Sequence, residues 1–303
     1  MYYSICITYF YKRNNIISLL KELKKYKKKK IEIIVRNDNP KHILRLDNKI
    51  CKNHKLIIIN EKKKSIGEIE SIKYLLKKST GKIISIIADD DLLLKNCFDE
   101  IDKIKHYFDC VVFPVTFDKK NLRKKIFHNT LSQIEMLNLF FKRKLNLSGT
   151  IATFYESNFL NRTFNKLKNK KYNLDTILTI KYLLEKKCIF INKINGFNNI
   201  KTSKISSGDI NLKTFYYDNK LILNYLKNKK KNNLYLLYVI LYLQNFYSVI
   251  FRNFKIKNFK YTNLFFKNLF IKNKIILNIK ILFYIIKTKI LITLRVILNL
   301  LGI

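Results

Sequence analysis

The first third of the chain alternates nearly continuous apolar runs with segments whose apolar residues recur at helical spacing. The apolar runs predict strands at residues 2–8, 30–38, 54–60 and 82–88. Between them, residues 14–26 and 65–81 have the periodicity of amphipathic helices. Strands that are apolar on both faces are typical of a sheet covered by helices on both sides. This order predicts an α/β fold with a mostly parallel sheet and right-handed crossovers.

The alternation continues, with less regular spacing, through the next hundred or so residues. Further strands and helices are predicted, with strands at residues 109–117 and 148–155 and helices at residues 96–107, 130–143 and 172–187. Capping boxes mark two of the helix starts. Ser65 and Glu68 form one of these pairs, and Thr130 and Gln133 form the other.

The composition changes after a polar stretch near residues 195–213. From Phe215 onward the chain consists mainly of Leu, Ile, Tyr, Phe, Asn and Lys at helical periodicity, with few acidic residues. The change predicts two domains. Residues 1–210 would form the α/β domain, and residues 211–303 a basic, helical C-terminal region.

The apolar runs of this C-terminal region are much shorter than the roughly 20 residues that a membrane-spanning helix needs. We therefore expect no transmembrane helix. Lys and Arg recur every three to five positions beside Phe, Leu and Ile, which favours a helix lying on an anionic membrane surface. The alternative is that the apolar face of the region packs against the first domain.

The charge of the chain limits its partners. The 61 Lys and Arg residues outnumber the 21 Asp and Glu residues, for a formal net charge of +40. Such a surface attracts nucleic acids, anionic lipids or phosphorylated small molecules. The lysines are spread through nearly every segment without a nucleic-acid-binding motif, so we expect no nucleic acid as a partner. The five widely spaced cysteines and an N-terminus without a leader indicate a cytoplasmic protein with reduced thiols.

Three consecutive acidic residues, Asp89, Asp90 and Asp91, directly follow the strand predicted at residues 82–88. This places them at the carboxyl end of the strand, where open α/β sheets bind their ligands. If the strand geometry continues, Asp89 and Asp91 face the same way and Asp90 the opposite way. Two carboxylates on one side suit manganese (Mn²⁺) or magnesium (Mg²⁺). The alternative is an acidic turn that caps the following helix.

The order of "SICITYFYKRNNIISLLKEL", "IEIIVRND" and "NEKKKSIGEIESIKYLLKKSTGKIISIIADDDLLL" resembles the family 2 glycosyltransferases of GT-A fold. The resemblance covers roughly residues 1–205 and implies a GT-A-like, Rossmann-like sheet. It matches the aspartates to the family's DXD-type motif. Asp89 and Asp91 would then hold the metal and the sugar-nucleotide diphosphate, and Asp90 would contact the sugar or serve as a structural cap.

The resemblance also implies how the nucleotide is bound. Thr8 and Tyr9, at the end of the first predicted strand, would contact the nucleotide, and Arg13 would reach the phosphates. Asp38 falls where the family binds the base or ribose, and a carboxylate can accept hydrogen bonds from either. The alternative for Asp38 is an Asx turn before Asn39.

Inverting sugar transfer needs a general base for the acceptor hydroxyl. In the family this is an acidic residue near the start of a later helix, and the resemblance places Asp175 there, with Leu174 where a Glu usually stands. Asp175 alternatively is an ordinary first-turn aspartate. By the same resemblance Ser148 and Gly149 are acceptor-side contacts. The family's later Arg/His loop has only a loose counterpart in residues 201–206, without the His.

Together these features predict an inverting glycosyltransferase that takes a sugar from a nucleotide-diphosphate donor. The resemblance implies a glycan or lipid-linked acceptor in bacterial cell-surface polysaccharide or lipooligosaccharide synthesis. The basic C-terminal region predicts that the protein binds peripherally to the inner face of the cytoplasmic membrane. Two alternatives stay open: a basic nucleic-acid-binding protein, and a degenerate, non-catalytic transferase-like protein at the membrane.

Overall fold

The computed structural model divides the chain into two compact units. One unit comprises residues 1–136 and 145–202, and the other residues 137–144 and 203–303. The predicted domain boundary after residue 210 lies outside the described residues. The structure describes residues 2–10, 15–104, 107–125, 131–142, 144–166, 174–185, 187–197, 212–229, 232–252, 282–283, 285–287 and 289–290.

The first unit is built on a seven-stranded sheet with the order β3-β2-β1-β4-β8-β6-β9. The first four of these strands are parallel. Strand β8 runs antiparallel to both of its neighbours, and β6 and β9 are parallel to each other. The predicted α/β fold with a mostly parallel sheet is therefore confirmed. The strands are β1 (Tyr3–Tyr9), β2 (Ile31–Asn37), β3 (Lys55–Asn60), β4 (Ile83–Ala88), β6 (Cys110–Val112), β8 (Thr153–Glu156) and β9 (Cys188–Phe190).

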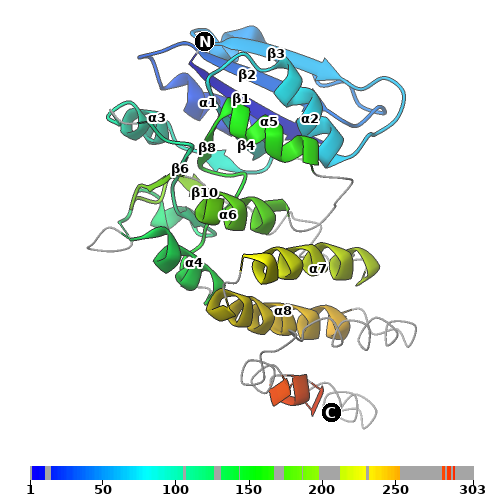
Figure 1. Cartoon of the computed structure of the whole chain (residues 1–303). Helices are drawn as coiled ribbons and strands as arrows, with labels where there is room; N and C mark the ends of the chain where they lie inside the picture. Colours follow the sequence, from blue (N-terminus) through cyan, green and yellow to red (C-terminus); the bar gives the residue numbers. More distant parts are fainter. Residues whose placement is uncertain are drawn as a thin grey trace. The chain divides into compact units, whose positions relative to one another are not determined.

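Helices cover both faces of the parallel strands. Helix α1 (Asn15–Lys24) buries leucines against the side chains of β1 and β2 that include Ile5 and Ile33. The opposite face carries α2 (Glu68–Lys78) and α5 (Ser157–Lys166), which lie side by side (Figure 1). Because both faces are covered, continuous apolar runs are what these strands require.

A three-stranded sheet lies beside the large one, with the order β5-β10-β7. The predicted strand at residues 109–117 is divided between β6 and β7, because Pro114 has no N–H to donate to a ladder. The five cysteines are free thiols. The remaining elements of this region are η1 (Asn48–Cys51), β5 (Leu92–Leu93), α3 (Asn96–Ile101), β7 (Val115–Thr116), η2 (Lys119–Asn121), α4 (Gln133–Phe141), α6 (Leu174–Glu185) and β10 (Gly196–Phe197).

The predicted capping box of Ser65 and Glu68 is not found. Helix α2 starts at Glu68 after Gly67, which has φ 84° and no side-chain cap, because the Ser65 hydroxyl donates to Asp38 instead. At α4 the reciprocal pair is Ser132 and Glu135, with backbone N–H groups donating to Glu135 Oε2 (2.8 Å) and Ser132 Oγ (3.3 Å). This pair lies two residues beyond the predicted one, whose Thr130 is outside the described residues.

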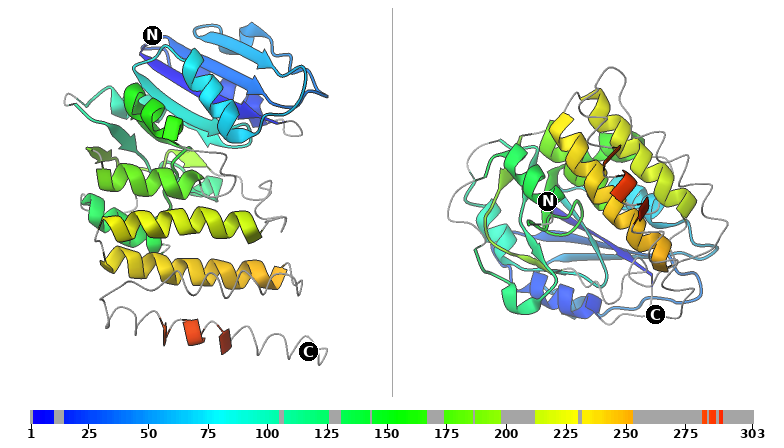
Figure 2. Two further views of the ribbon diagram at one scale, coloured as in Figure 1. Left: turned by 45° about the vertical axis from the view of Figure 1, so that its right-hand side comes forward. Right: turned by 90° about the horizontal axis from the view of Figure 1, so that it is seen from below.

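The second unit contains helices α7 (Leu212–Asn228) and α8 (Asn232–Arg252), which lie side by side (Figure 2). The buried Tyr238 hydroxyl donates to Asn219 Oδ1 at 2.5 Å and joins the two helices. The Tyr238 ring also packs against Phe141, with 5.5 Å between ring centroids. None of the helices among the described residues combines the length and apolar character that crossing a bilayer would require.

Candidate active site

Strands β1, β2 and β4 end at the same edge of the large sheet. Their ladder continues one residue beyond the strands: the N–H of Asp38 donates to the Tyr9 carbonyl (3.0 Å), and the N–H of Asp89 donates to the Thr8 carbonyl (3.0 Å). Thr8, Tyr9, Asp38 and Asp89 are therefore neighbours at the carboxyl edge, where open α/β sheets bind ligands. Arg13, expected near the phosphates, lies outside the described residues.

The three aspartates lie on a turn and not on an extension of β4. The N–H of Asp91 donates to the Ala88 carbonyl at 3.2 Å, which turns the backbone at Asp89 and Asp90. The expectation that strand alternation aligns Asp89 with Asp91 is therefore wrong, because alternation ends where the turn begins. All three side chains are buried, with exposed fractions of 7%, 8% and 7%.

The three aspartates do not cap the next helix, which was the alternative role considered for them. Helix α3 begins at Asn96, its cap residue is Lys95, and that cap makes no side-chain hydrogen bond. Strand β5 lies between the turn and this helix and pairs with β10. The acidic turn thus belongs to the sheet edge.

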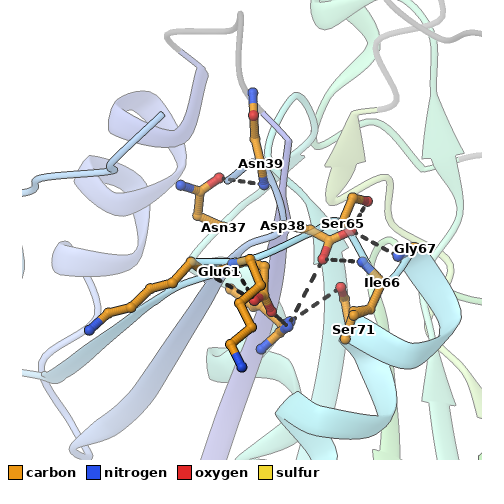
Figure 3. Close-up of polar contacts among 11 residues, drawn as sticks. Asn37, Asp38, Asn39, Glu61, Ser65, Ile66, Gly67 and Ser71 are labelled. Atoms are coloured by element: carbon orange, nitrogen blue, oxygen red, sulfur yellow. Dashed lines mark hydrogen bonds and ion pairs between the residues drawn. The ribbon is translucent and has the colours of Figure 1, made fainter. Parts of the chain in front are cut away.

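Asp38 holds the turn that leads into α2 (Figure 3). Its Oδ2 accepts hydrogen bonds from Ser65 Oγ (2.5 Å) and the N–H of Gly67 (2.9 Å), and its Oδ1 accepts one from the N–H of Ile66 (2.9 Å). The Asx turn considered for Asp38 is made by Asn37 instead, whose Oδ1 accepts from the N–H of Asn39 at 3.1 Å.

The buried Arg36 stabilises this arrangement through ion pairs and a hydrogen bond. The Arg36 guanidinium pairs with Glu61 Oε2 at 2.6 Å and lies 4.0 Å from Asp38 Oδ1. Its Nε donates to Ser71 Oγ of α2 (3.3 Å). A buried cation needs such partners, because an unpaired charge is costly away from water. The network fixes β2 and the start of α2 together.

Asp175 lies in the first turn of α6 and is held by two hydroxyl groups. Its Oδ1 accepts hydrogen bonds from Thr150 Oγ1 (2.6 Å) and Ser148 Oγ (3.1 Å). The side chain is partly exposed but has protein around it on most sides, and this burial raises the pKa of its carboxyl group, while the two hydroxyl groups oppose that rise.

Glu68, the first residue of α2, brings the separate acidic segments into one neighbourhood. Glu68 is an exposed residue, but nearby protein removes water from around its carboxyl group, and this desolvation, with the negative charges of Asp175 and Asp90, raises its pKa to about 7. The sequence marks Glu68 only as part of a capping box. Because its two carboxylate neighbours are more than twenty and more than a hundred residues away, no local pattern could have identified it.

The residues expected on the acceptor side have supporting positions. Ser148 is 2% exposed and its hydroxyl bonds to Asp175. Gly149 lies against α6, where an added Cβ would be 2.7 Å from the Asp175 carbonyl oxygen. The loose counterpart of the family's Arg/His loop, residues 201–206, lies outside the described residues.

The family model of glycosyl transferase family 2 matches residues 4–164, which is more than half of the chain. The chain belongs to this family. The sequence resemblance to family 2 glycosyltransferases is therefore confirmed. No match is found among curated proteins.

Solved structures of S. aureus TarS have the same fold as this glycosyl transferase family 2 chain. TarS 1–349 has a TM-score of 0.67 and 15% identity, and the match covers 89% of this chain and 80% of that one. For TarS 1–349 in complex with UDP-GlcNAc the TM-score is 0.69 and the identity 15%, and the match covers 89% of this chain and 82% of that one. For a longer TarS structure the TM-score is 0.60 and the identity 17%, and the match covers 79% of this chain and 43% of that one.

We next consider which side chains of this family 2 chain could share a metal ion with the phosphates of a substrate. Among the described residues, no group of three or more His, Cys, Asp and Glu side chains is arranged to hold a metal ion alone. Mg²⁺ usually takes only one or two protein carboxylates, and substrate phosphates and water complete its shell. Asp89 and Asp91 are carboxylates at the carboxyl edge of the sheet, and carboxylate oxygens are the hard donors that such a site would use.

Proposed function

We propose that this glycosyltransferase is inverting and metal-dependent, and that it moves a hexose-type sugar from a nucleotide-diphosphate donor to a glycan or lipid-linked acceptor. One observation carries the proposal: the acidic turn that follows β4 meets Thr8, Tyr9 and Asp38 at the carboxyl edge of the sheet. Asp175 of α6 and Asp90 of this turn both lie within electrostatic reach of Glu68. The TarS structure with the same fold holds UDP-GlcNAc, which supports a nucleotide-sugar donor.

On the donor side, Asp89 and Asp91 would hold Mn²⁺ or Mg²⁺. When bound, the ion neutralises the diphosphate and makes it a better leaving group. Thr8, Tyr9 and Asp38 border the place for the nucleoside, Arg13 reaches the phosphates, and Asp90 contacts the sugar.

On the acceptor side, Asp175 takes the proton of the attacking hydroxyl group. The acceptor oxygen forms its bond to the anomeric carbon while the bond from that carbon to the diphosphate oxygen breaks. The proton passes to the Asp175 carboxylate, and the electron pair leaves with the nucleoside diphosphate. Because the two bonds lie on opposite faces of the sugar, the anomeric configuration inverts.

The acceptor proposal rests on the family and on the basic C-terminal region. We propose that the protein lies on the inner face of the cytoplasmic membrane and builds a bacterial cell-surface polysaccharide or lipooligosaccharide. A surface glycan growing on a lipid carrier would be held near such a protein by the same anionic membrane.

A thermal-shift screen tests the donor and the metal together. UDP-, GDP-, CMP- and dTDP-sugars are added to the full chain with and without Mn²⁺, and we expect one diphosphate sugar to raise the Tm only when Mn²⁺ is present. Asp91→Ala should abolish this shift and sugar transfer while the protein stays folded. Asp99→Ala, which removes a surface carboxylate paired with Lys28 at 3.1 Å, is the matched control. A full Mn²⁺-dependent shift in Asp91→Ala would contradict the metal assignment.

A further inference from the structure

A short turn before β8 contacts Asp175 through two side chains. Thr150 Oγ1 donates to Asp175 Oδ1 at 2.6 Å, and Ser148 Oγ donates to the same oxygen at 3.1 Å. We propose that Thr150, supported by Ser148, is the positioning residue that orients the carboxylate of Asp175 and keeps it charged. The inference rests on the proposed function, in which Asp175 is the base.

The turn is held firmly enough to act as a template. The Ser148 hydroxyl accepts hydrogen bonds from the N–H groups of Thr150 (3.1 Å) and Ile151 (2.9 Å). From β8, Thr153 Oγ1 donates to the Ser148 carbonyl (2.5 Å), and the Tyr155 hydroxyl donates to the Gly149 carbonyl (2.5 Å). Side chains of a rigid strand therefore fix the backbone that carries the two hydroxyl groups.

Gly149 lets this turn approach α6 closely. An added Cβ would lie 2.4 Å from Leu178 Cβ and 2.7 Å from the Asp175 carbonyl oxygen, distances that real Cβ atoms do not tolerate. Any side chain at this position would push the turn away from the helix. The bond of 2.6 Å between Thr150 and Asp175 depends on this contact.

The surroundings of Asp175 oppose its charged form. Burial raises the pKa of its carboxyl group, and Thr150 and Ser148 lower it. Two titratable neighbours also lie within electrostatic reach: Glu68 at the start of α2 and Tyr155 of β8. Glu68 in turn feels Asp90 of the acidic turn. A charged base in this place needs donors, and the hydroxyl groups of Thr150 and Ser148 supply them.

The test is a direct titration of Asp175 in the full chain. Protein labelled with ¹³C at the aspartate carboxyl carbons is titrated by NMR, and Asp175→Asn identifies the Asp175 signal. Thr150→Val removes the hydroxyl and keeps the shape of the side chain. Its Asp175 midpoint should rise by about one pH unit, the size expected for one hydrogen bond to a charged group. Thr150→Ser should return the midpoint towards the wild-type value.

Thr116→Val is the matched control, because it removes a threonine hydroxyl that donates to the Asp118 carbonyl (3.1 Å) in the smaller sheet. The Thr116→Val substitution should leave the titration midpoint of Asp175 unchanged. An unchanged midpoint in Thr150→Val, or an equal rise in Thr116→Val, would overturn the proposal. If Thr150→Val does not fold, Thr150→Ala replaces it, since that substitution adds no atom.

A second measurement separates this proposal from the function on which it rests. Release of nucleoside diphosphate from the sugar nucleotide selected by the thermal-shift screen is followed against pH. Loss of release in Asp175→Asn, with the acidic limb of Thr150→Val moved upward by about one unit, supports both proposals. Full release by Asp175→Asn would reject Asp175 as the base, whereas an unmoved limb in Thr150→Val would reject only the role of Thr150.

Discussion

Asp38 is buried and Asp175 is partly exposed, and the two carboxylates make different sets of hydrogen bonds. Both oxygens of Asp38 accept hydrogen bonds from the turn at residues 65–67. The hydroxyl bonds to Asp175 reach Oδ1 from a second turn. Asp38 thus shapes the loop at residues 65–67 through both of its oxygens, whereas the two hydroxyl groups that bind Asp175 meet at one oxygen. The same residue type has two functions because the number and direction of its donors differ.

We predict that Asp38→Ala destabilises the protein and weakens nucleotide binding. It removes the acceptor of three hydrogen bonds and one of the carboxylates near Arg36. The free energy of unfolding should fall by about 3 kcal/mol, measured by urea denaturation. Ser65→Ala, which removes one donor to the same carboxylate, should cost about 1 kcal/mol. Equal stabilities of Asp38→Ala and Ser65→Ala would contradict this reading of the turn.

Helices α2 and α6 each bring an acidic first turn to the site, Glu68 on one and Asp175 on the other. A helix N-terminus favours a negative charge. Here the removal of water from around both carboxyl groups acts against it, and for Glu68 the charges of Asp175 and Asp90 do so as well, so both pKa values are raised. Part of the stability of these elements is therefore given up to gather negative charge where a sugar and a metal would bind.

We predict that Glu68→Gln stabilises the metal-free protein at high pH. The pKa of Glu68 is raised from 4.5 to about 7 on folding, so between these values the unfolded state binds fewer protons and stability falls as the pH rises. The Tm of Glu68→Gln, measured with EDTA, should exceed that of the wild type at pH 8, and the gain should shrink towards pH 5.

Glu70→Gln provides the comparison on the same helix, since Glu70 pairs with Lys73 at 2.7 Å on the surface. Its Tm should not gain on the wild type as the pH rises. A constant difference between Glu68→Gln and the wild type over this pH range would mean that Glu68 does not titrate between its unfolded and folded values.

Over the whole molecule, the formal net charge is +40, and three of the 21 acidic residues stand together at Asp89, Asp90 and Asp91. Long-range attraction of a nucleotide sugar follows from such a field and weakens with salt. In the second unit, four large apolar side chains are exposed beside Lys287 and Lys289. They are Leu282, Phe283, Ile286 and Ile290, with exposed fractions of 46%, 63%, 48% and 54%. Apolar and basic side chains together suit an anionic bilayer surface.

We predict that the full chain sediments with vesicles containing phosphatidylglycerol and that this binding weakens as salt is added. The double substitution Phe283→Ser/Ile286→Ser should reduce the bound fraction, because it removes apolar area. Leu221→Ser, which changes a side chain exposed by 37% on α7, is the matched control. Equal binding to neutral phosphatidylcholine vesicles, or no binding to either, would reject the membrane proposal.

The parallel strands and the acidic segment after β4 could be read from the sequence. Strands buried on both faces must be apolar throughout, and a chain with 21 acidic residues seldom places three together. These features are local, so the pattern of neighbouring residues was enough to predict them. The family's order of elements also pointed to Asp38 and Asp175 before any contact was known.

What these residues touch was decided by the tertiary structure. Ser65 meets a carboxylate 27 residues away and not its own helix, and the acidic turn replaces a strand as soon as pairing ends at Ala88. The pKa of Glu68 is raised by desolvation and by the charges of Asp175 and Asp90, which belong to two other segments. The sequence alone determined which segments are strands and helices and which family they compose. Only the packing of those segments determined which carboxylates accept hydrogen bonds and which lie near other negative charges, because such interactions act through space between residues that are distant in the chain.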